Sequence, residues 1–363
     1  LWDRDTNNFM PRIGLVYSLT PKTVIRTNYG IFYAFMGVRR GDVIQTGFSY
    51  TTNLVPTLDG VTYIATMANP FPGGITEPPG ASLGANTFLG QGVSFFQANL
   101  KTPYNQRWNF GIQRELPSRT VLNLTYSGSR GVAIETTRDL AALPNQYLST
   151  SPVRDDARNN YLGANLSNPF AGLVPGTGRN GTTIARRSLL MPYPQFTSVS
   201  TTTNQGYSTY HALAIEADRR FSKGFTVQAG YTFSKFMEAT SYLNGADPMP
   251  AYSISDQDIP HRFNMSFIYE LPFGRGRALF AGAPKAVNAL IGGWQVQGIH
   301  VRQAGFALGF GDMLLYGTLK DIPLPKDQRS IDRWFNTSVF ERSNTRALVS
   351  HLRTASPRFA GIR

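Results

Sequence analysis

Cysteine is absent from this chain of 363 residues. Disulfide bridges, zinc–thiolate sites and thiol nucleophiles are therefore excluded, although the cellular compartment is left open. Long hydrophobic runs are also missing, since no stretch reaches the ~18 consecutive apolar residues of a membrane-spanning helix. A membrane-spanning strand needs only about 9–11 residues, half of which can be polar, so the mean hydropathy of −0.21 is compatible with a membrane β-barrel.

Charge is sparse as well, because Asp, Glu, Lys and Arg make up only 16% of the residues, while the net charge is +13. The basic residues are scattered singly or in pairs such as Arg39-Arg40, and no nucleic-acid-binding motif accompanies them. Nucleic acid is therefore not an expected partner. The chain instead contains 41% hydrophobic and 12% aromatic residues with 35 Gly and 23 Pro, a mixture typical of strands and turns, so we expect an all-β protein.

Strand periodicity is clearest between residues 211 and 235. The segment Phe225 to Lys235 alternates apolar and polar residues throughout, which is the period of a β-strand. The preceding segment, His211 to Phe221, alternates in the same way and has its charged residues on one side only. Ser222-Lys223-Gly224 joins the two segments as a short hairpin turn.

Three more hairpins follow this pattern. One spans residues 12–33 with a turn at Pro21-Lys22, and another spans residues 108–126 with a turn at Pro117-Ser118-Arg119. The last spans residues 262–303, and its connection contains one expected helical turn between Pro284 and Leu290. In its second strand the alternation slips, which predicts a bulge near Gly298.

Long connections separate these hairpins, at about residues 34–103, 131–209, 237–260 and 305–357. Short turns at one end of consecutive strands and long loops at the other are typical of outer-membrane barrels, where the turns are periplasmic and the loops extracellular. A soluble sandwich has no reason for this asymmetry. Aromatic residues near the strand ends favour interfacial girdles over a plain strand preference. The expected girdle residues are Tyr29, Phe32, Tyr33, Tyr104, Trp108, Tyr126, Tyr231, Phe233 and Trp294.

An ordered set of motifs runs from Pro11 to near the C-terminal end. The segments are 11–17, 23–33, 102–114, 210–213 with 219–222, 230–235, 260–263, 270–275 and 292–298. Examples are Thr102-Pro-Tyr-Asn-Gln-Arg-Trp108, Gly230-Tyr-Thr-Phe-Ser-Lys235 and Gly292-Gly-Trp-Gln-Val-Gln-Gly298. Together they resemble the barrel of TonB-dependent outer-membrane receptors of the Oar-like group, whose full-length members often carry an N-terminal carboxypeptidase-regulatory-like domain.

The resemblance implies a 22-stranded barrel plugged by an N-terminal domain. It also implies uptake of an extracellular solute with energy from the TonB complex, in contact with outer-membrane lipid, in the outer membrane of a Gram-negative bacterium. About eight strands are recognisable, and no plug or TonB-box-like segment precedes Leu1. We therefore expect residues 1–363 to be a partial antiparallel transmembrane β-barrel, without the plug and the closing strands, and an internal segment of a longer secreted protein.

The alternation also predicts which polar residues face the lumen. In a plugged barrel such residues bind the plug, each other or water, and fewer contact the solute, for which loop residues near the mouth are better candidates. The predicted lumen-facing set is Arg12, Arg26, Gln113, Glu115, Glu216, Asp218, Arg220, Arg262 and Glu270.

Catalytic and metal-binding motifs are missing from the sequence. The four histidines, His211, His261, His300 and His351, have no metal-ligand spacing, so structural roles are expected. For His261 we expect a hydrogen bond or ion pair with the acidic stretch Asp256-Gln-Asp258. That stretch and Asp155-Asp156 offer oxygen ligands for Ca²⁺, but neither follows the EF-hand pattern, and solvated loop charges are the simpler interpretation. We expect no cofactor.

The sequence thus favours TonB-dependent transport of a solute by a barrel that is not an enzyme. Two alternatives stay open: a passive porin or surface adhesion barrel, and a soluble β-sandwich binding module. An outer-membrane hydrolase has no Ser/His/Asp motif in its support.

Overall fold

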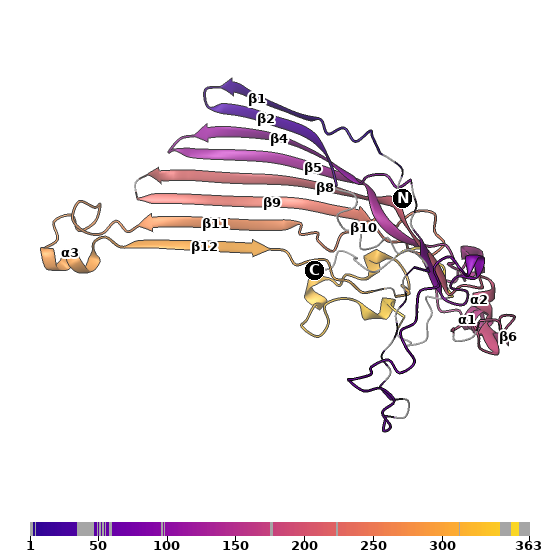
Figure 1. Cartoon of the computed structure of the whole chain (residues 1–363). Helices are drawn as coiled ribbons and strands as arrows, with labels where there is room; N and C mark the ends of the chain where they lie inside the picture. Colours follow the sequence, from indigo (N-terminus) through magenta and orange to yellow (C-terminus); the bar gives the residue numbers. More distant parts are fainter. Residues whose placement is uncertain are drawn as a thin grey trace.

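The computed structural model describes residues 3, 5–34, 47–48, 50, 52, 54, 56–57, 60–95, 97, 99–174, 177–222, 224–311, 313–341 and 350–355, without the side chains of residues 220–222. Its main element is one sheet in which antiparallel neighbours follow chain order, β1-β2-β4-β5-β8-β9-β11-β12 (Figure 1). The outermost strands β1 and β12 do not pair with each other, so the sheet is an open wall. The expectation of an all-β, antiparallel partial barrel is confirmed.

The strands of the wall are β1 (Arg12–Thr20), β2 (Thr23–Tyr33), β4 (Tyr104–Leu116), β5 (Thr120–Asp139), β8 (Ser198–Ser222), β9 (Phe225–Ala239), β11 (His261–Glu270) and β12 (Gln295–Gln303). Two short strands join its loop end: β3 (Gly92–Phe95), parallel to β8, and β10 (Ser253–Ile254), antiparallel to β9. A separate ladder pairs β6 (Asn165–Ser167) with β7 (Thr183–Ala185).

The helices are short. They are α1 (Asp156–Gly163), α2 (Arg186–Leu189) and α3 (Lys285–Ile291), with 3₁₀ turns at Gly84–Asn86, Asn145–Tyr147, Leu319–Asp321, Lys326–Gln328 and Thr337–Val339. In the described part of the chain, no helix has the length and apolar character needed to cross a membrane.

Short turns and long loops lie at opposite ends of the wall (Figure 1). At the turn between β4 and β5, Ser118 and Arg119 have φ of 63° and 57°, the left-handed conformation that suits a tight hairpin reversal. The expected helical turn between β11 and β12 is α3, and it lies at the same end as the tight turns (Figure 1). The asymmetry predicted from the sequence is therefore confirmed.

Two strands are longer than predicted. The loop expected at residues 131–209 is shorter, because β5 continues to Asp139 and β8 already begins at Ser198. The extra length pairs Thr136–Asp139 with Ser200–Thr203 after two register shifts, and it buries a Thr136–Thr203 hydroxyl hydrogen bond of 2.9 Å. This extension could not be predicted from the sequence, because residues 198–204 are mostly Ser and Thr and show no alternation of apolar and polar side chains.

The bulge expected near Gly298 is wrong. The β11–β12 register runs without a shift from Arg262↔Gln303 to Glu270↔Gln295. The alternation slips because Ile299, which is 83% exposed, pairs with Ser266 and so lies on the same face as Arg262 and Glu270.

Cross-strand register divides the wall into two faces, because directly paired residues share a face. One row of consecutive partners is wholly apolar and defines what we call the outer face: Ile25, Ile112, Leu124, Ile215, Tyr231 and Phe263. The row beside it defines the inner face: Arg26, Gly111, Thr125, Ala214, Thr232 and Arg262. Leu124 and Ile215 are 39% and 40% exposed, so this apolar row is not covered by other described parts of the chain.

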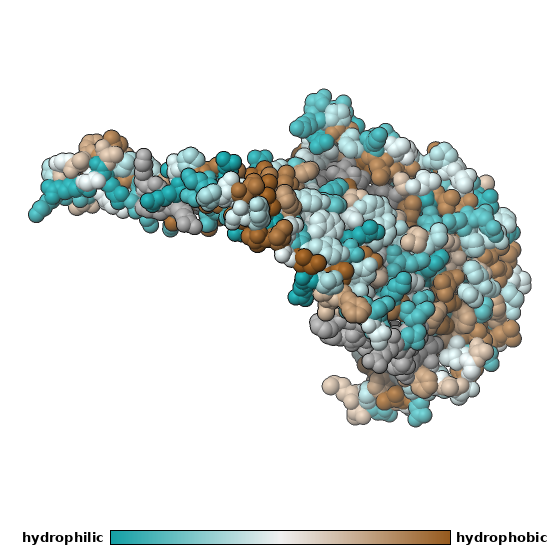
Figure 2. Space-filling view, turned by 90° about the horizontal axis from the view of Figure 1, so that it is seen from above, coloured by the Kyte–Doolittle hydropathy of each residue, from teal (hydrophilic) through white to brown (hydrophobic). Residues whose placement is uncertain are grey.

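Most of the buried hydrophobic residues that the structure describes lie outside the strands of the wall. A small hydrophobic core forms after β12, where Ile322, Val339 and Phe340 are buried against Phe310 and Phe335. The Phe310 ring lies 4.6 Å from Phe335 and 5.2 Å from Phe340, centroid to centroid. Seen from above, the molecule has a narrow arm that widens into a body of mixed hydrophilic and hydrophobic surface (Figure 2).

Candidate functional site

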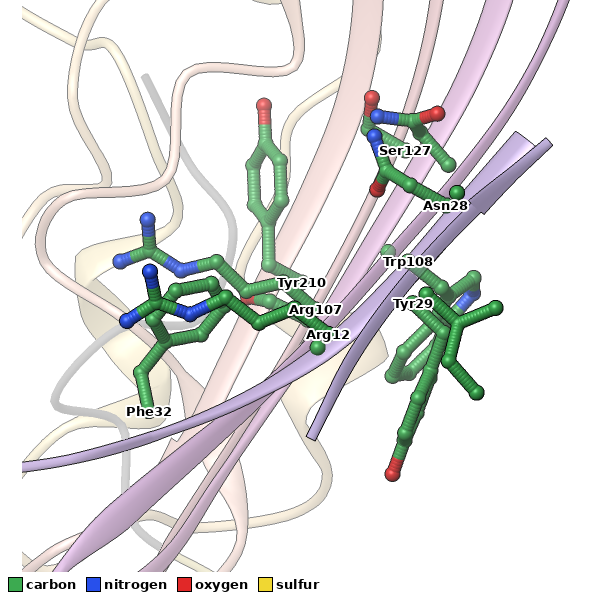
Figure 3. Close-up of a pocket in the computed structure, with 14 residues that line it drawn as sticks. Arg12, Asn28, Tyr29, Phe32, Arg107, Trp108, Ser127 and Tyr210 are labelled. Atoms are coloured by element: carbon green, nitrogen blue, oxygen red, sulfur yellow. The ribbon is translucent and has the colours of Figure 1, made fainter. Parts of the chain in front are cut away.

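A groove of about 630 Å³ lies on the wall near the loop end of β1, β2, β4 and β5 (Figure 3). One row of paired residues on the inner face lines this groove. The row runs Arg12, Gly30, Arg107, Ser129 and Tyr210, so five neighbouring strands contribute one residue each. Figure 3 shows Arg12, Arg107, Phe32 and Tyr210 pointing to one side of the sheet and Tyr29 and Trp108 to the other.

Gly30 makes room for the aromatic centre of this groove. A Cβ atom at Gly30 would lie 3.0 Å from the Phe32 ring, so the ring folds back over the glycine. The guanidinium carbon of Arg12 lies 4.8 Å from the ring centroid, and that of Arg107 lies 5.6 Å from it. Both distances allow a cation–π interaction, which holds two positive groups beside one ring.

No carboxylate is paired with these two arginines, Arg12 and Arg107, in the part of the chain that the structure describes. Asn28 and Asn109 add side-chain amides to the lining of the groove, and Ser129 and Tyr210 add hydroxyl groups. The groove therefore presents guanidinium, amide and hydroxyl groups that are suited to binding an anionic or planar group.

The predicted lumen-facing residues are spread along the inner face. Register places eight of them there: Arg12, Arg26, Gln113, Glu115, Glu216, Asp218, Arg262 and Glu270. The side chain of Arg220 lies outside the described part of the structure.

These residues do not form one site. Gln113 and Glu216 share a row across Asn123, whereas Glu270 binds Arg277 at 2.7 Å near the turn end. Only Arg12 belongs to the groove. That these residues face a lumen stays a prediction.

Sequence reasoning missed Phe32, Arg107 and Tyr210 as members of a site. Phe32 was expected in an aromatic girdle, but it pairs with Asn105 and belongs to the inner face, so that expectation is wrong for this residue. Arg107 has the same parity as Asn109 and Gln113, and extending that strand by one step would have found it.

Three histidines lie on the outer face, His211, His261 and His300, and the first two each lie beside a tyrosine. His211 forms a 2.7 Å hydrogen bond with the Tyr126 hydroxyl, and His261 forms one of the same length with Tyr231. The expected contact of His261 with the acidic stretch is therefore wrong. Asp258 is instead fully buried, accepts a 2.6 Å hydrogen bond from the Phe236 amide and lies 3.6 Å from Lys235 Nζ.

His351 is buried among the β5–β8 and β9–β11 connections and the segment after β12, which together we call the loop body. Its Nε2 accepts a 2.9 Å hydrogen bond from the backbone amide of Asp155, the N-cap residue of α1. The Asp155 carboxylate accepts hydrogen bonds from the Ser149 hydroxyl and the Arg158 amide, and these hold its pKa below the ordinary value of 3.8. Over the described ranges, no group of three or more His, Asp or Glu side chains could hold a metal ion.

The outer membrane beta barrel domain family matches residues 1–357 of the sequence. The chain belongs to this family of outer-membrane β-barrels. It is therefore a protein of the outer membrane of a Gram-negative bacterium. No curated protein matches the sequence.

Solved structures of outer-membrane receptors resemble this barrel chain at low identity. The alcaligin receptor FauA from Bordetella pertussis shares 12% identity over 84% of this chain, with a TM-score of 0.35. FpvA from P. aeruginosa, solved with bound pyoverdines, shares 13% over 74%, with a TM-score of 0.30. The ferric enterobactin receptor PfeA from Pseudomonas aeruginosa shares 10% over 72%, with a TM-score of 0.29. This chain spans 30%, 21% and 28% of those chains.

Proposed function

We propose that this protein carries a solute across the outer membrane in a TonB-dependent manner. The observation that carries the proposal is the ordered motif set of TonB-dependent receptors in a chain whose family is the outer-membrane barrel. The partners of this proposal are an extracellular solute, outer-membrane lipid and the TonB complex, which acts through a plug domain.

The side chains of the inner-face groove favour binding of a solute over catalysis of a reaction. The groove around Arg12, Phe32 and Arg107 lies at the loop end, where an extracellular solute would enter. Its groups bind through charge, hydrogen bonds and aromatic contact, and none is paired with a base that would activate a nucleophile. In this proposal the residues bind and guide a solute, and no covalent step takes place.

Growth measurements test the proposal. A strain lacking the gene is compared with its parent on a panel of siderophores, cobalamin, carbohydrates and peptides as single nutrient sources. We expect a growth defect on at least one of them, and we expect deletion of tonB alone to reproduce it. A defect that is indifferent to TonB would overturn the proposal in favour of a passive porin, and surface binding without any uptake defect would favour an adhesion barrel.

A further inference from the structure

A second cavity, of about 440 Å³, lies in the loop body away from the inner-face groove. Three connections that are distant in sequence meet there. The β5–β8 connection contributes Arg179 and Arg187, the β9–β11 connection contributes Asn244, and the segment after β12 contributes His351 and Arg353. Each of these connections leaves the wall at its loop end, which is the extracellular end of a barrel with this layout.

Arg179 is an unusual member of the lining because it is a buried cation. Its side chain and backbone together are only 8% exposed, and Nη2 donates a 2.8 Å hydrogen bond to the Phe196 carbonyl oxygen. Its Nε is buried with no acceptor. Burial lowers the pKa of Arg179 below its ordinary value, and the nearby charge of Arg187 lowers it further.

A buried charge without an opposite charge is costly, so proteins seldom leave one unpaired. No residue that lines this cavity is Asp or Glu. Within the described part of the chain, neither Arg179 nor Arg187 forms an ion pair. The unpaired Nε of Arg179 and the adjacent Arg187 are thus two positive groups that lack an anion.

The surrounding structure holds these groups in place. Asn168 donates a 2.6 Å hydrogen bond from its side-chain amide to the Arg179 carbonyl oxygen, which fixes the backbone behind the guanidinium. Asn244 forms hydrogen bonds of 2.9 Å and 2.8 Å with the backbone of Arg353, which ties the segment after β12 to the cavity. The cavity is therefore built from anchored backbone.

Two neighbouring arginines of helix α2 have side chains in different surroundings. Arg187 lines the cavity, whereas Arg186 donates a 3.0 Å hydrogen bond to the Tyr161 carbonyl oxygen and lies 4.1 Å from the Tyr161 ring centroid. The chain thus supplies its own control, because the two side chains carry the same charge on the same helix and only one of them reaches the cavity.

We propose that this loop cavity binds an anionic oxygen group, a carboxylate or a phosphate, between Arg179 and Arg187. Guanidinium groups match the geometry of both anions and bind them with charge-assisted hydrogen bonds. That the anion belongs to an extracellular solute rests on the proposed function, whereas the binding itself does not.

Titration calorimetry on the full-length protein in detergent tests this, with inorganic phosphate and citrate as probes at constant ionic strength. We expect saturable binding of at least one probe, and the preferred probe distinguishes phosphate from carboxylate. Arg187→Gln should weaken binding about 10- to 100-fold, because a hydrogen bond to a charged group contributes about 1.5–3 kcal/mol and every 1.4 kcal/mol is tenfold. Arg187→Lys should retain part of the affinity, since it retains the charge.

Arg186→Gln is the matched control and should change the dissociation constant by less than about twofold, as a surface charge does. Equal weakening by Arg186→Gln and Arg187→Gln would overturn the site, because only net charge would then matter. The absence of saturable binding of both probes would overturn it as well. Since the assay measures no transport, its result is separate from the TonB test.

Discussion

The contact between Trp108 and Gly128 gives a sharp test of the outer face. Gly128 is paired with Trp108 across β4 and β5, and a Cβ atom added to Gly128 would lie 2.3 Å from Trp108 Cε2. Ordinary contacts of this kind are longer than 3.4 Å. Gly128→Ala therefore forces the indole to move, and this disturbs its contact with His211, whose ring centroid lies 6.2 Å from that of Trp108.

The expected loss follows from two opposing effects. Overpacking costs about 1–3 kcal/mol. Replacing glycine with alanine restrains the unfolded chain and returns about 0.4–1 kcal/mol. We therefore expect Gly128→Ala to lower the free energy of unfolding by about 1–2 kcal/mol. The assay is urea unfolding of the protein in phospholipid vesicles.

Two controls isolate the cause. Gly14→Ala, on β1, would place its Cβ 3.9 Å from its nearest neighbours and should be neutral or slightly stabilising. In a Trp108→Ala background, Gly128→Ala should lose most of its cost, because the clashing ring is gone. The reasoning is refuted if Gly128→Ala costs as much without Trp108 as with it, or if Gly14→Ala costs the same.

Three further expectations follow from other parts of the structure. Asp155→Asn keeps the N-cap but loses the charge. Because the pKa of Asp155 is lowered, the stability that the carboxylate contributes is present above pH 3.8 and is lost as the pH falls further. The melting temperatures of wild type and variant should therefore converge in acid, and a difference that widens there would contradict this. Phe340→Ala removes the centre of the small core and should cost about 3–5 kcal/mol locally, measured as faster proteolysis of residues 305–341 with an unchanged wall. Tyr231→Phe removes the hydrogen bond to His261 and should cost about 0.5–1.5 kcal/mol in urea unfolding, whereas a neutral result would assign that pair no role in stability.

The strands were predictable where one face is apolar and the other polar, as in β9. The groove was not, because it depends on register: Arg12 and Arg107 are neighbours only through Gly30, and no local pattern relates β1 to β4. The loop cavity was even less predictable from the sequence. Arg179, Asn244 and Arg353 come from three connections whose Gly- and Pro-rich sequences carry no periodicity, so their meeting depends on side-chain hydrogen bonds that composition does not encode.

The central claim is that the two faces of the wall meet different media, lipid outside and a polar interior inside. The chain has no cysteine, so single nitroxide labels at Ile215→Cys and Ala214→Cys, adjacent on β8 and on opposite faces, measure this directly by electron paramagnetic resonance. In reconstituted membranes we expect the label at 215 to relax faster with lipid-soluble oxygen, and we expect the label at 214 to be shielded from the lipid phase. Equal oxygen accessibility at both positions, or the reverse order, would contradict the account.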